Sequence, residues 1–414
     1  MVWALVDAAM GAALVVVALR WLVFVLCAVV DLSQQRGRLP ELTQSRASEQ
    51  PGVVVLIPAY REEVVIESTM QRVLASDYPN LQVVVVDDGS PDDTAAAARR
   101  VADPRARVVV QPRNAGKAEA LNRGLAETKA EIVVTVDADT WLAPDAVSWM
   151  VAAMQTRDAA AVATHVEVGN RRNLWTRWQS LEYVAGLNID RRAQSVLRVI
   201  TTVPGAASAW RRDVLEEFGG FPSRTLAEDT DLTLTLLRHS HRVVFESRAR
   251  SRTEAPEHPA ALFRQRLRWL HGNLQCAWHH TLTGPAPWRV RLLALPNLWF
   301  AHLGVYLLLP VTLAYAWLDH SAMSAQLLAI LFAVLFSIDL LAMAVAYGLD
   351  RADWRDLPWA PSQRVGYPLF LWAVFAVVSL RILRGAATSW NKLERTGHLE
   401  EPQPSGSGDD LDVR

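Results

Sequence analysis

The apolar residues of this 414-residue chain are gathered into long stretches that flank a polar middle. At about 1.5 Å of helix rise per residue, each stretch is long enough to cross the roughly 30 Å hydrocarbon core of a bilayer. This pattern predicts a membrane protein with a large domain between its membrane segments. The predicted membrane segments are Val2–Val30, Asn297–Leu318, Ala325–Leu349 and Val365–Leu383.

The first stretch predicts a membrane anchor over residues 1–32. No Lys or Arg precedes it, which does not fit a secretory signal peptide. Arg36 and Arg38 follow it as flanking charges of the cytoplasmic side. Arg20 lies inside the stretch, where it must either pair with another helix or reach the headgroups of a tilted span.

The end of the chain forms a second membrane region over residues 291–384, with a polar tail over 385–414. Arg351, Arg355 and Arg364 predict a cytosolic loop between the last two spans. The tail ends in a Pro/Gly/Ser-rich segment, which predicts disorder. Three spans after a cytosolic domain would place this tail outside, whereas Arg381 and the basic residues after it favour the inside, so its side stays open.

Composition excludes several classes of protein. Hydrophobic residues make up 51% of the chain and the net charge is −1, so there is no basic surface for nucleic acid. Cys27 and Cys276 are too few for a disulfide framework or a cysteine-based zinc site. We therefore expect the polar domain to face a reducing cytosol, with membrane lipids around the apolar segments.

Residues 51–256 alternate short β-branched runs with helical patterns, which predicts an α/β domain with a mostly parallel, Rossmann-like sheet. The predicted strands are Val53–Ile57, Leu81–Val86, Arg107–Val110 and Ile132–Val136. The predicted helices between them are Glu62–Ala75, Asp92–Val101 and Gly116–Thr128. Ligands of such sheets bind beyond the carboxyl ends of the strands.

Carboxylates follow three of these strands. Glu62 comes after the first, Asp87-Asp88 after the second, and Asp137-Ala138-Asp139 after the fourth. Any one of them has a structural alternative, because Asp is common in turns and at helix starts. Together at one edge they would repel one another unless a cation lay among them. Mg²⁺ takes one or two protein carboxylates plus phosphate oxygens, so the pattern predicts a metal-bound nucleoside diphosphate.

Three further motifs are candidates for the same site. Lys117 stands at a helix start in Asn114–Asn122, which suits a phosphate but is not a Walker A loop. Glu228-Asp229 begins an amphipathic run, where helix capping is the alternative. Gln265–Trp269 lies in a basic, aromatic segment, which also suits an interfacial amphipathic helix over residues 257–290.

Taken in order, these motifs resemble the inverting family-two glycosyltransferases of GT-A fold. More narrowly, the chain is similar to bacterial poly-β-1,6-N-acetylglucosamine synthases, which are related to chitin, hyaluronan and cellulose synthases. The segments that carry the resemblance are Pro58–Glu62, Asp87–Ser90, Asn114–Asn122, Asp137–Asp139, Gly169–Leu174, Gly205–Arg212, Glu228-Asp229, Gln265–Trp269 and Trp390–Gly397.

The resemblance implies a role for each matching residue. The donor-binding residues would be Tyr60, Glu62, Asp88, Lys117, Asp137, Gln265 and Arg268. Asp139, helped by Asp137, would hold Mg²⁺ or Mn²⁺. Asp229 would be the general base of the acidic pair with Glu228, and Trp269 would contact the acceptor.

The implied enzyme is a hexosyltransferase of the bacterial inner membrane with its catalytic domain in the cytoplasm. It would polymerise N-acetylglucosamine from UDP-GlcNAc into a biofilm-type polysaccharide, with coupled export and, since the predicted spans are few, a small membrane partner or oligomer. One alternative is a single transfer to a polyprenyl-phosphate or other lipid acceptor. Another class is a non-catalytic, nucleotide-sensing transporter or receptor. A Rossmann dehydrogenase is disfavoured, because no Gly-x-Gly-x-x-Gly follows the first strand.

Two positions depart from the family pattern. Ala227 precedes the acidic pair where many members carry Thr or Ser, and Thr164-His165 stands where relatives often have Gly-Asn. The second departure lies near the expected acceptor region, so acceptor and sugar specificity stay open. A buried, hydrogen-bonded His165 at a strand end is the structural alternative.

Overall fold

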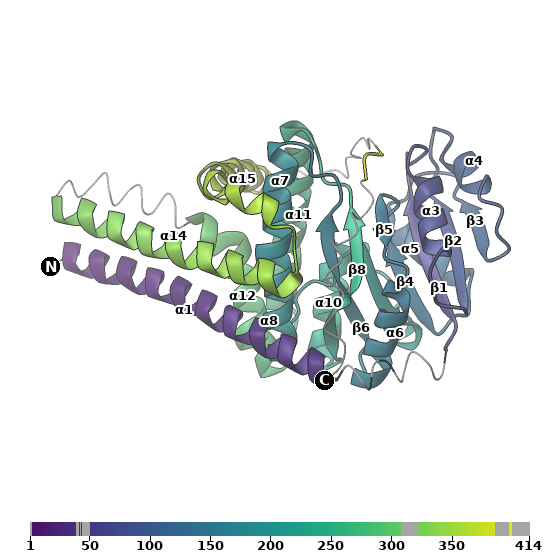
Figure 1. Ribbon diagram of the computed structural model, residues 1–414, viewed down its shortest axis with the longest axis horizontal. Helices are drawn as coiled ribbons and strands as arrows, with labels where there is room; N and C mark the ends of the chain where they lie inside the picture. The colour runs from purple at the N-terminus through teal and green to yellow at the C-terminus, as the bar shows by residue number, and fades with distance from the viewer. Residues whose placement is uncertain are drawn as a thin grey trace.

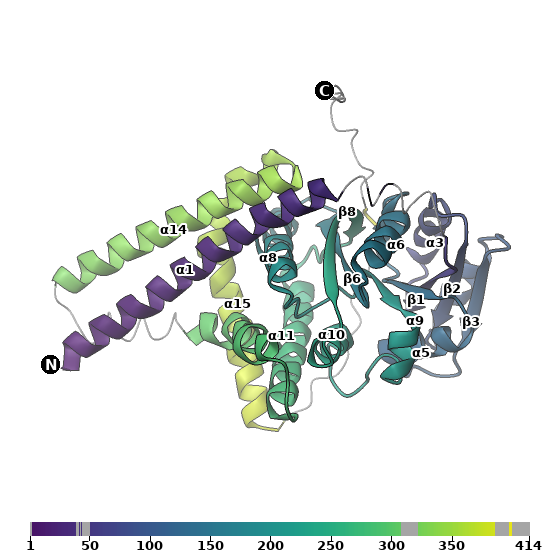
Figure 2. The same cartoon turned by 90° about the horizontal axis from the view of Figure 1, so that it is seen from below.

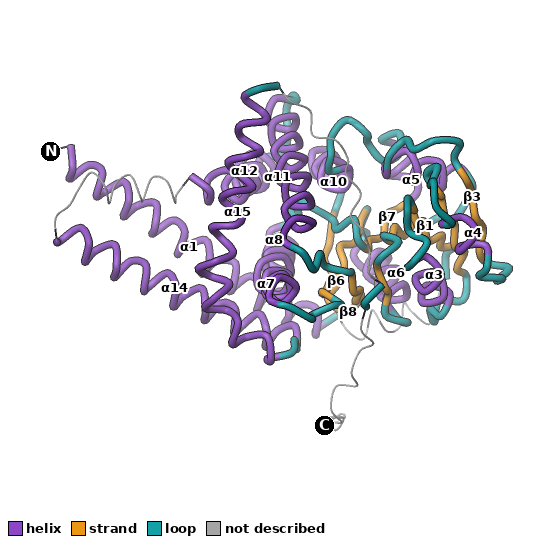
Figure 3. Tube along the Cα trace, turned by 90° about the horizontal axis from the view of Figure 1, so that it is seen from above, coloured by secondary structure: helices purple, strands orange, loops and turns teal. Residues whose placement is uncertain are grey.

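The computed structural model describes residues 2–38, 41, 43, 50–307, 322–385 and 397–399. One end of the molecule is a sheet covered by helices, and two long helices project from the other end (Figure 1). Seen from above, α7, α8, α11 and α15 lie between the sheet with its covering helices and the projecting pair (Figure 3). The α/β domain and the apolar segments predicted from the sequence therefore lie side by side.

The sheet has eight strands in the order β3-β2-β1-β4-β7-β6-β8-β5. They are β1 (Val53–Ala59), β2 (Leu81–Asp87), β3 (Ala106–Val110), β4 (Ile132–Val136), β5 (Thr140–Leu142), β6 (Ala161–Val168), β7 (Ala207–Arg211) and β8 (Val243–Thr253). The four predicted strands are confirmed and pair in parallel, with Val53 opposite both Leu81 and Ile132. Their carboxyl ends therefore share one edge.

The second half of the sheet is mixed. β7 runs antiparallel to β4 and β6, β6 and β8 are parallel, and β5 is antiparallel to β8. The sequence pattern predicted none of these strands. β7 reads Ala-Ser-Ala-Trp-Arg, without the β-branched run that marked the others, and alternate residues of β8 are polar or charged.

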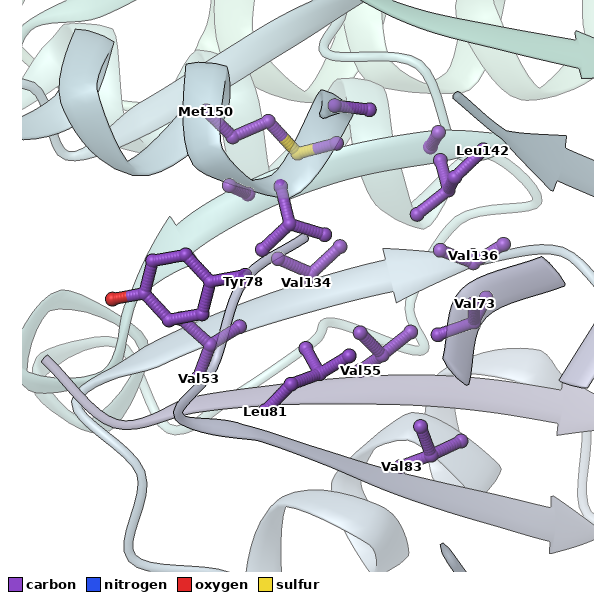
Figure 4. Close-up of a cluster of buried hydrophobic side chains, with 14 of the residues drawn as sticks. Val53, Val55, Val73, Tyr78, Leu81, Val83, Val134, Val136, Leu142 and Met150 are labelled. Carbon is purple, nitrogen blue, oxygen red and sulfur yellow. The ribbon is translucent and has the colours of Figure 1, made fainter. Parts of the chain in front are cut away.

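Helices cover both faces of the sheet, as a buried parallel sheet requires. They are α3 (Ile66–Leu74), α4 (Thr94–Arg99) and α6 (Ala146–Arg157) on one face, and α5 (Lys117–Ala126), α9 (Arg212–Glu217), α10 (Glu228–Arg238) and α11 (Pro259–Leu282) on the other. Alternate residues of β1 serve the two cores: Val53, Val55 and Ile57 face the first, Val54 and Leu56 the second. Figure 4 shows the first core, where Val55, Val134 and Met150 pack together.

The predicted helix starting at Glu62 begins four residues later, at Ile66. The Glu62 carbonyl accepts hydrogen bonds from the Val65 and Ile66 amides, and Arg61 has a positive φ of 57°. A tight turn therefore separates β1 from α3. This turn holds Tyr60–Glu62 beside the strand ends instead of inside a helix.

A continuous helix links the sheet to the apolar part of the chain. It is built from α7 (Leu174–Glu182), the π-helix η1 (Tyr183–Asn188) and α8 (Ile189–Leu197). Around it lie α1 (Val2–Gly37), α14 (Ala322–Asp350), η4 (Trp354–Trp359) and α15 (Ala360–Leu383), together with η2 (Val290–Ala294), α12 (Leu295–Trp299) and η3 (Phe300–Gly304). α1 packs on both α8 and α14, and α1 and α14 project together (Figure 2).

Three helices within the described residues are long and apolar enough to cross a membrane: Val15–Gly37, Val290–Leu307 and Trp354–Leu383. They overlap the predicted segments Val2–Val30, Asn297–Leu318 and Val365–Leu383. The end of the second predicted segment, residues 308–318, lies outside the described residues. The predicted segment Ala325–Leu349 forms α14, one 29-residue helix. Apart from residues 397–399, the tail beyond residue 385 is outside the described residues, and its side of the membrane stays open.

Arg20 pairs with neighbouring helices, which is one of the two outcomes that the sequence left open. Its guanidinium lies 3.0 Å from the Asp190 carboxylate of α8 and 3.1 Å from the Asn297 amide oxygen of α12. A second arginine, Arg192, joins α8 to Asp31 of α1 at 3.1 Å and to Asp350 of α14 at 2.8 Å. Paired charges thus fasten the projecting helices to the rest of the protein.

Candidate active site

A cavity of about 530 Å³ opens at the carboxyl ends of β1, β2 and β4 and extends between α8, α11, α12, η3 and α15. Every residue that the sequence proposed for the site lines this one cavity. They are Tyr60, Glu62, Asp88, Lys117, Asp137, Asp139, Glu228, Asp229, Gln265, Arg268 and Trp269. Segments far apart in the sequence therefore meet here.

Lys117 connects the carboxylates that follow β4 with those that begin α10. Its ammonium nitrogen lies 2.6 Å from Asp137 Oδ1 and 3.3 Å from Glu228 Oε1. Burial opposes the charge on Lys117, but these two carboxylates outweigh that effect and raise its pKa above the usual value. Lys117 is therefore a permanent cation among the acidic residues. With a side-chain exposure of 17%, Lys117 is not a solvated lysine on a surface helix.

Asp88 is occupied with the backbone of the neighbouring loop. Its two carboxylate oxygens accept hydrogen bonds of 2.8 Å from the amides of Ala115 and Gly116 and from the Gln111 side chain. Burial raises the pKa of Asp88, while the two backbone amides oppose that rise. Asp88 thus fixes the loop that presents Lys117, and its contact with a nucleotide stays a prediction.

Asp229 stands in the first turn of α10 and lines the cavity. Its Oδ2 accepts a 3.0 Å hydrogen bond from the Gly205 amide and its Oδ1 a 2.7 Å bond from Thr230. Burial, and then the charge of Glu228, raise the pKa of Asp229 to about 6, against the opposing charge of Lys117. The capping alternative therefore holds in part, because Oδ1 accepts a hydrogen bond from a backbone amide in the first turn of the helix. The carboxylate nevertheless borders the cavity, and its pKa is suited to proton transfer near neutrality.

Gly205 leaves room for the ends of the Lys117 and Asp229 side chains, which both approach its backbone. A Cβ at this position would lie 2.9 Å from Lys117 Nζ and 3.1 Å from Asp229 Oδ2. The Gly205 carbonyl also accepts a 3.3 Å hydrogen bond from Lys117. The segment that contains Gly205 resembles the family, but the sequence assigned Gly205 itself no role. The requirement for glycine becomes visible only when the structure shows that a side chain here would collide with Lys117 and Asp229.

We expect Gly205→Ala to lower the turnover number by about tenfold or more, since a displacement of about 1 Å in a site costs on the order of a hundredfold. The protein should still fold, because the atoms that must move are the ends of side chains. Gly52→Ala is the matched control, since its Cβ would meet neighbours only at 3.7 Å or more. Initial rates of donor consumption and melting curves test this. Equal rates for both variants would show that the space left by Gly205 is unimportant.

Trp269 is held in the cavity wall by Arg266. The Arg266 guanidinium lies 4.2 Å from the Trp269 ring centroid and bonds to Glu182 of α7, Tyr367 of α15 and Gln265. Burial disfavours its charge, but Glu182 outweighs burial and raises the pKa of Arg266 above its usual value. α11 thus carries site residues while it packs between the sheet and α15.

The two departures from the family pattern lie in closely packed surroundings. Ala227 is so close to Gly272 of α11 that a Cβ on Gly272 would lie 2.9 Å from Ala227 Cβ. His165 lies at a register shift of β6 and faces Glu167 at 3.3 Å and Asp350 at 3.6 Å. It is buried and does not line the cavity, which agrees with the structural alternative, but it lies inside β6 and its Nδ1 has no hydrogen-bond partner among the described residues.

Arg191 is a cavity residue that the sequence analysis missed. It is 8% exposed, and its Nη1 has no hydrogen-bond partner among the described residues. No motif marked it, since it stands in a helical stretch beside another arginine, Arg192, of opposite orientation. A buried cation lining a site is visible only when the helices are assembled.

The donor set at the end of β4 fits a divalent ion. Among the described side chains, no three His, Cys, Asp or Glu residues gather as a ready-made metal site. Asp137 and Asp139 supply two carboxylates at the cavity, and Mg²⁺ or Mn²⁺ at such sites takes its other oxygens from phosphates and water. The adjoining Lys117 ammonium already stabilises negative charge at the same place.

Residues 51–272 match a family model described as "Glycosyltransferase like family 2". This range contains all eight strands of the sheet and all the site residues named above. Fold and site together define a glycosyltransferase with a GT-A-like, mixed and mostly parallel sheet. The chain belongs to glycosyltransferase family 2.

Two relatives give the range of similarity. The chain is 34% identical over 234 residues to "Probable glycosyltransferase YdaM" of Bacillus subtilis, covering 54% of this chain and 56% of that protein. It is 24% identical over 233 residues to the poly-β-1,6-N-acetyl-D-glucosamine synthase of Staphylococcus epidermidis, covering 56% and 57%. The chain spans just over half the length of these curated relatives.

The fold extends beyond the sheet domain in one solved structure. The mannosyltransferase PcManGT from Pyrobaculum calidifontis, solved with GDP-Man and Mn²⁺, superposes with a TM-score of 0.62 at 23% identity. The match covers 87% of this chain and 99% of that one. The arrangement of sheet and apolar helices is therefore shared, while the identity is too low to transfer a substrate.

Proposed function

We propose that this protein is an inverting, metal-dependent glycosyltransferase that transfers N-acetylglucosamine from UDP-GlcNAc to a growing polysaccharide. The observation that carries the proposal is the meeting of Asp137, Asp139, Lys117 and Asp229 in one cavity. Acidic and basic groups lie where a diphosphate would bind, next to a carboxylate of raised pKa. The sugar is chosen from the named relatives, the poly-N-acetylglucosamine synthases.

In this proposal Asp229 removes the proton from an acceptor hydroxyl, whose oxygen then attacks the anomeric carbon. The bond from that carbon to the diphosphate breaks, and its electron pair leaves with UDP. A divalent ion held by Asp139 and Asp137 would neutralise charge on the departing diphosphate. The diphosphate would be held by Lys117, Gln265 and Arg268. The uridine would be held by Tyr60, Glu62 and Asp88, and the acceptor sugar would contact Trp269. Glu228 tunes Asp229 through its charge.

The membrane side of the cavity supports an acceptor that is long or membrane-borne. α12, η3 and α15 contribute Leu298, Ala301, Leu371 and Val374 to its wall. Export of the product through the membrane, with the catalytic domain in the cytoplasm, is part of the proposal. A second candidate, single transfer to a lipid-linked acceptor, is favoured by the same apolar wall.

The raised pKa of Asp229 predicts the pH dependence. The carboxyl group acts as a base only when ionised, and its pKa is about 6. Below that pH its protonated form dominates, so the turnover number should fall about tenfold per pH unit, and it should be nearly level above pH 7. Single-turnover rates at saturating donor between pH 5 and 8 measure this. A profile without a break near pH 6 would contradict the assignment of Asp229.

A donor screen tests the function itself. Purified protein in detergent receives UDP-GlcNAc, UDP-glucose or GDP-mannose with Mg²⁺ or Mn²⁺, and product size is recorded by mass spectrometry. The proposal predicts UDP-GlcNAc consumption and a ladder of oligosaccharides. A product of one sugar on a lipid would favour the second candidate, and consumption of none of the donors would refute both.

A further inference from the structure

The cavity continues past the carboxylates into an inner chamber, which we define as the part lined by α8, α12, η3 and α15. Hydrogen-bonding groups enter this chamber from several helices: Arg191 and Gln194 from α8, Asn297 from α12 and His302 from η3. Tyr183 and Tyr306 add aromatic rings to the wall. Dispersed polar groups and aromatic faces are the usual lining of a site for a small polyhydroxylated ligand.

Arg191 differs from the two charged residues that flank it in α8. The charge of Asp190, its neighbour in sequence, is satisfied by Arg20 at 3.0 Å. Arg192 is satisfied by Asp31 and Asp350. Arg191 is also buried, at 8% exposure, yet its Nη1 has no hydrogen-bond partner in the described part of the chain. An unsatisfied buried donor is costly, and such groups persist where a ligand completes them.

An irregularity precedes Arg191 in its helix. The π-helix η1, Tyr183–Asn188, directly precedes α8 and shifts its phase. π-helical turns inside α-helices occur often at functional sites. Successive residues of a helix point about 100° apart, so the adjacent arginines of α8 face different surroundings: Arg191 lines the cavity, whereas Arg192 faces α1 and α14.

The surroundings of Arg191 include the proposed base. Burial lowers the pKa of Arg191 to about 10, while Tyr183 and then the charge of Asp229 oppose the decrease. Arg191 thus already lies in the field of the proposed base. The Arg191 side chain lines the cavity and can donate to an acceptor placed there, and a sugar hydroxyl oxygen provides one without adding charge.

We propose that the inner chamber is the acceptor-sugar subsite and that Arg191 positions the acceptor by donating a hydrogen bond to one of its hydroxyl oxygens. This inference rests on the proposed sugar transfer at Asp229, and it assigns a ligand to the membrane-facing part of the same cavity. Arg191 is a positioning residue: it holds the acceptor ring so that the attacking hydroxyl meets Asp229. It takes no part in the proton transfer.

The test compares two adjacent arginines. Arg191→Met keeps the size of the side chain and removes the unsatisfied donor, so its melting temperature should equal or exceed that of the wild type. Arg192→Met leaves Asp31 and Asp350 without their partner and should lower the melting temperature. Arg191→Lys keeps the charge and should restore part of the lost binding.

Calorimetry with a β-1,6-linked N-acetylglucosamine trisaccharide measures the subsite without catalysis. Arg191→Met should weaken trisaccharide binding about tenfold or more, as expected for a hydrogen bond from a charged donor. Its affinity for UDP with Mn²⁺ should stay within about twofold of wild type, and its acceptor KM should rise with the donor KM unchanged. Arg192→Met should leave both affinities unchanged in the protein that remains folded.

Several results would overturn the proposal. They are no trisaccharide binding by the wild type, equal trisaccharide binding by Arg191→Met, an equal loss of UDP binding, or a destabilisation as large as that of Arg192→Met. Binding of dodecyl phosphate in place of the trisaccharide would assign the chamber to a lipid phosphate instead. If the wild type binds the trisaccharide through Arg191 but consumes no UDP-sugar, the proposed function fails and the subsite stands.

Discussion

Asp229→Asn is expected to lower sugar transfer by about 10²–10⁴-fold, the range that a positioned general base contributes. The substitution keeps the shape of the side chain, and the amide oxygen can still accept one of the backbone hydrogen bonds from Gly205 or Thr230. It removes the group whose pKa of about 6 suits it to accept a proton. Donor binding should therefore persist while turnover is lost.

The measurement is a single-turnover rate together with UDP affinity. Asp231→Asn is the matched control, because Asp231 stands two residues along α10 and bonds to Arg224 and His280 instead of lining the cavity. Burial tends to raise the pKa of Asp231, but its hydrogen bonds to His280 and Arg224 outweigh that and lower it, so this control should lose stability. Transfer at the normal rate by Asp229→Asn would refute the base assignment.

Asp139→Asn is expected to abolish the response to Mn²⁺. Asp139 is 3% exposed and follows the buried strand β4, so its carboxylate is held at the cavity edge. Removing its charge weakens the binding of a divalent ion and, through that ion, the binding of the diphosphate. Since a metal supplies several kcal/mol to such a transition state, turnover should fall by about a hundredfold or more.

Titration of UDP binding with Mn²⁺ distinguishes this effect from that of Asp229→Asn. The Asp139 variant should show weak UDP binding at every Mn²⁺ concentration, whereas the Asp229 variant should keep the wild-type dependence. Asp158→Asn, at a side chain with 91% exposure on the surface, controls for the change in charge. An Asp139 variant that still tightens UDP binding when Mn²⁺ is added would show that the ion is held elsewhere.

The parallel half of the sheet was predictable because its strands are buried on both faces. Such strands read as unbroken β-branched runs, and β1, β2 and β4 begin where those runs begin. β7 and β8 were not predicted, because β7 has no β-branched residue and charged residues alternate along β8. The helical start at Glu62 was wrong, because the turn at Arg61 depends on its positive φ.

The site was predictable only where a residue type or a known motif marked it. Asp137 and Asp139 follow from strand position alone, whereas Asp229 and Trp269 depended on resemblance until the structure placed them in the same cavity. Gly205 is important because it leaves room for the side chains of Lys117 and Asp229. Arg191 is important because its Nη1 lacks a hydrogen-bond partner among the described residues. Both properties belong to assembled neighbours and leave no local signal in the sequence.

The most direct test of the central claim is the anomeric configuration of the product. Detergent-purified protein is incubated with UDP-GlcNAc and Mn²⁺, and the new linkage is read by proton NMR, with an EDTA-treated sample beside it. Direct displacement at the Asp139–Asp229 cavity predicts a β-linked product from the α-linked donor, and none after EDTA. An α-linked product, or undiminished transfer without a divalent ion, would contradict the account.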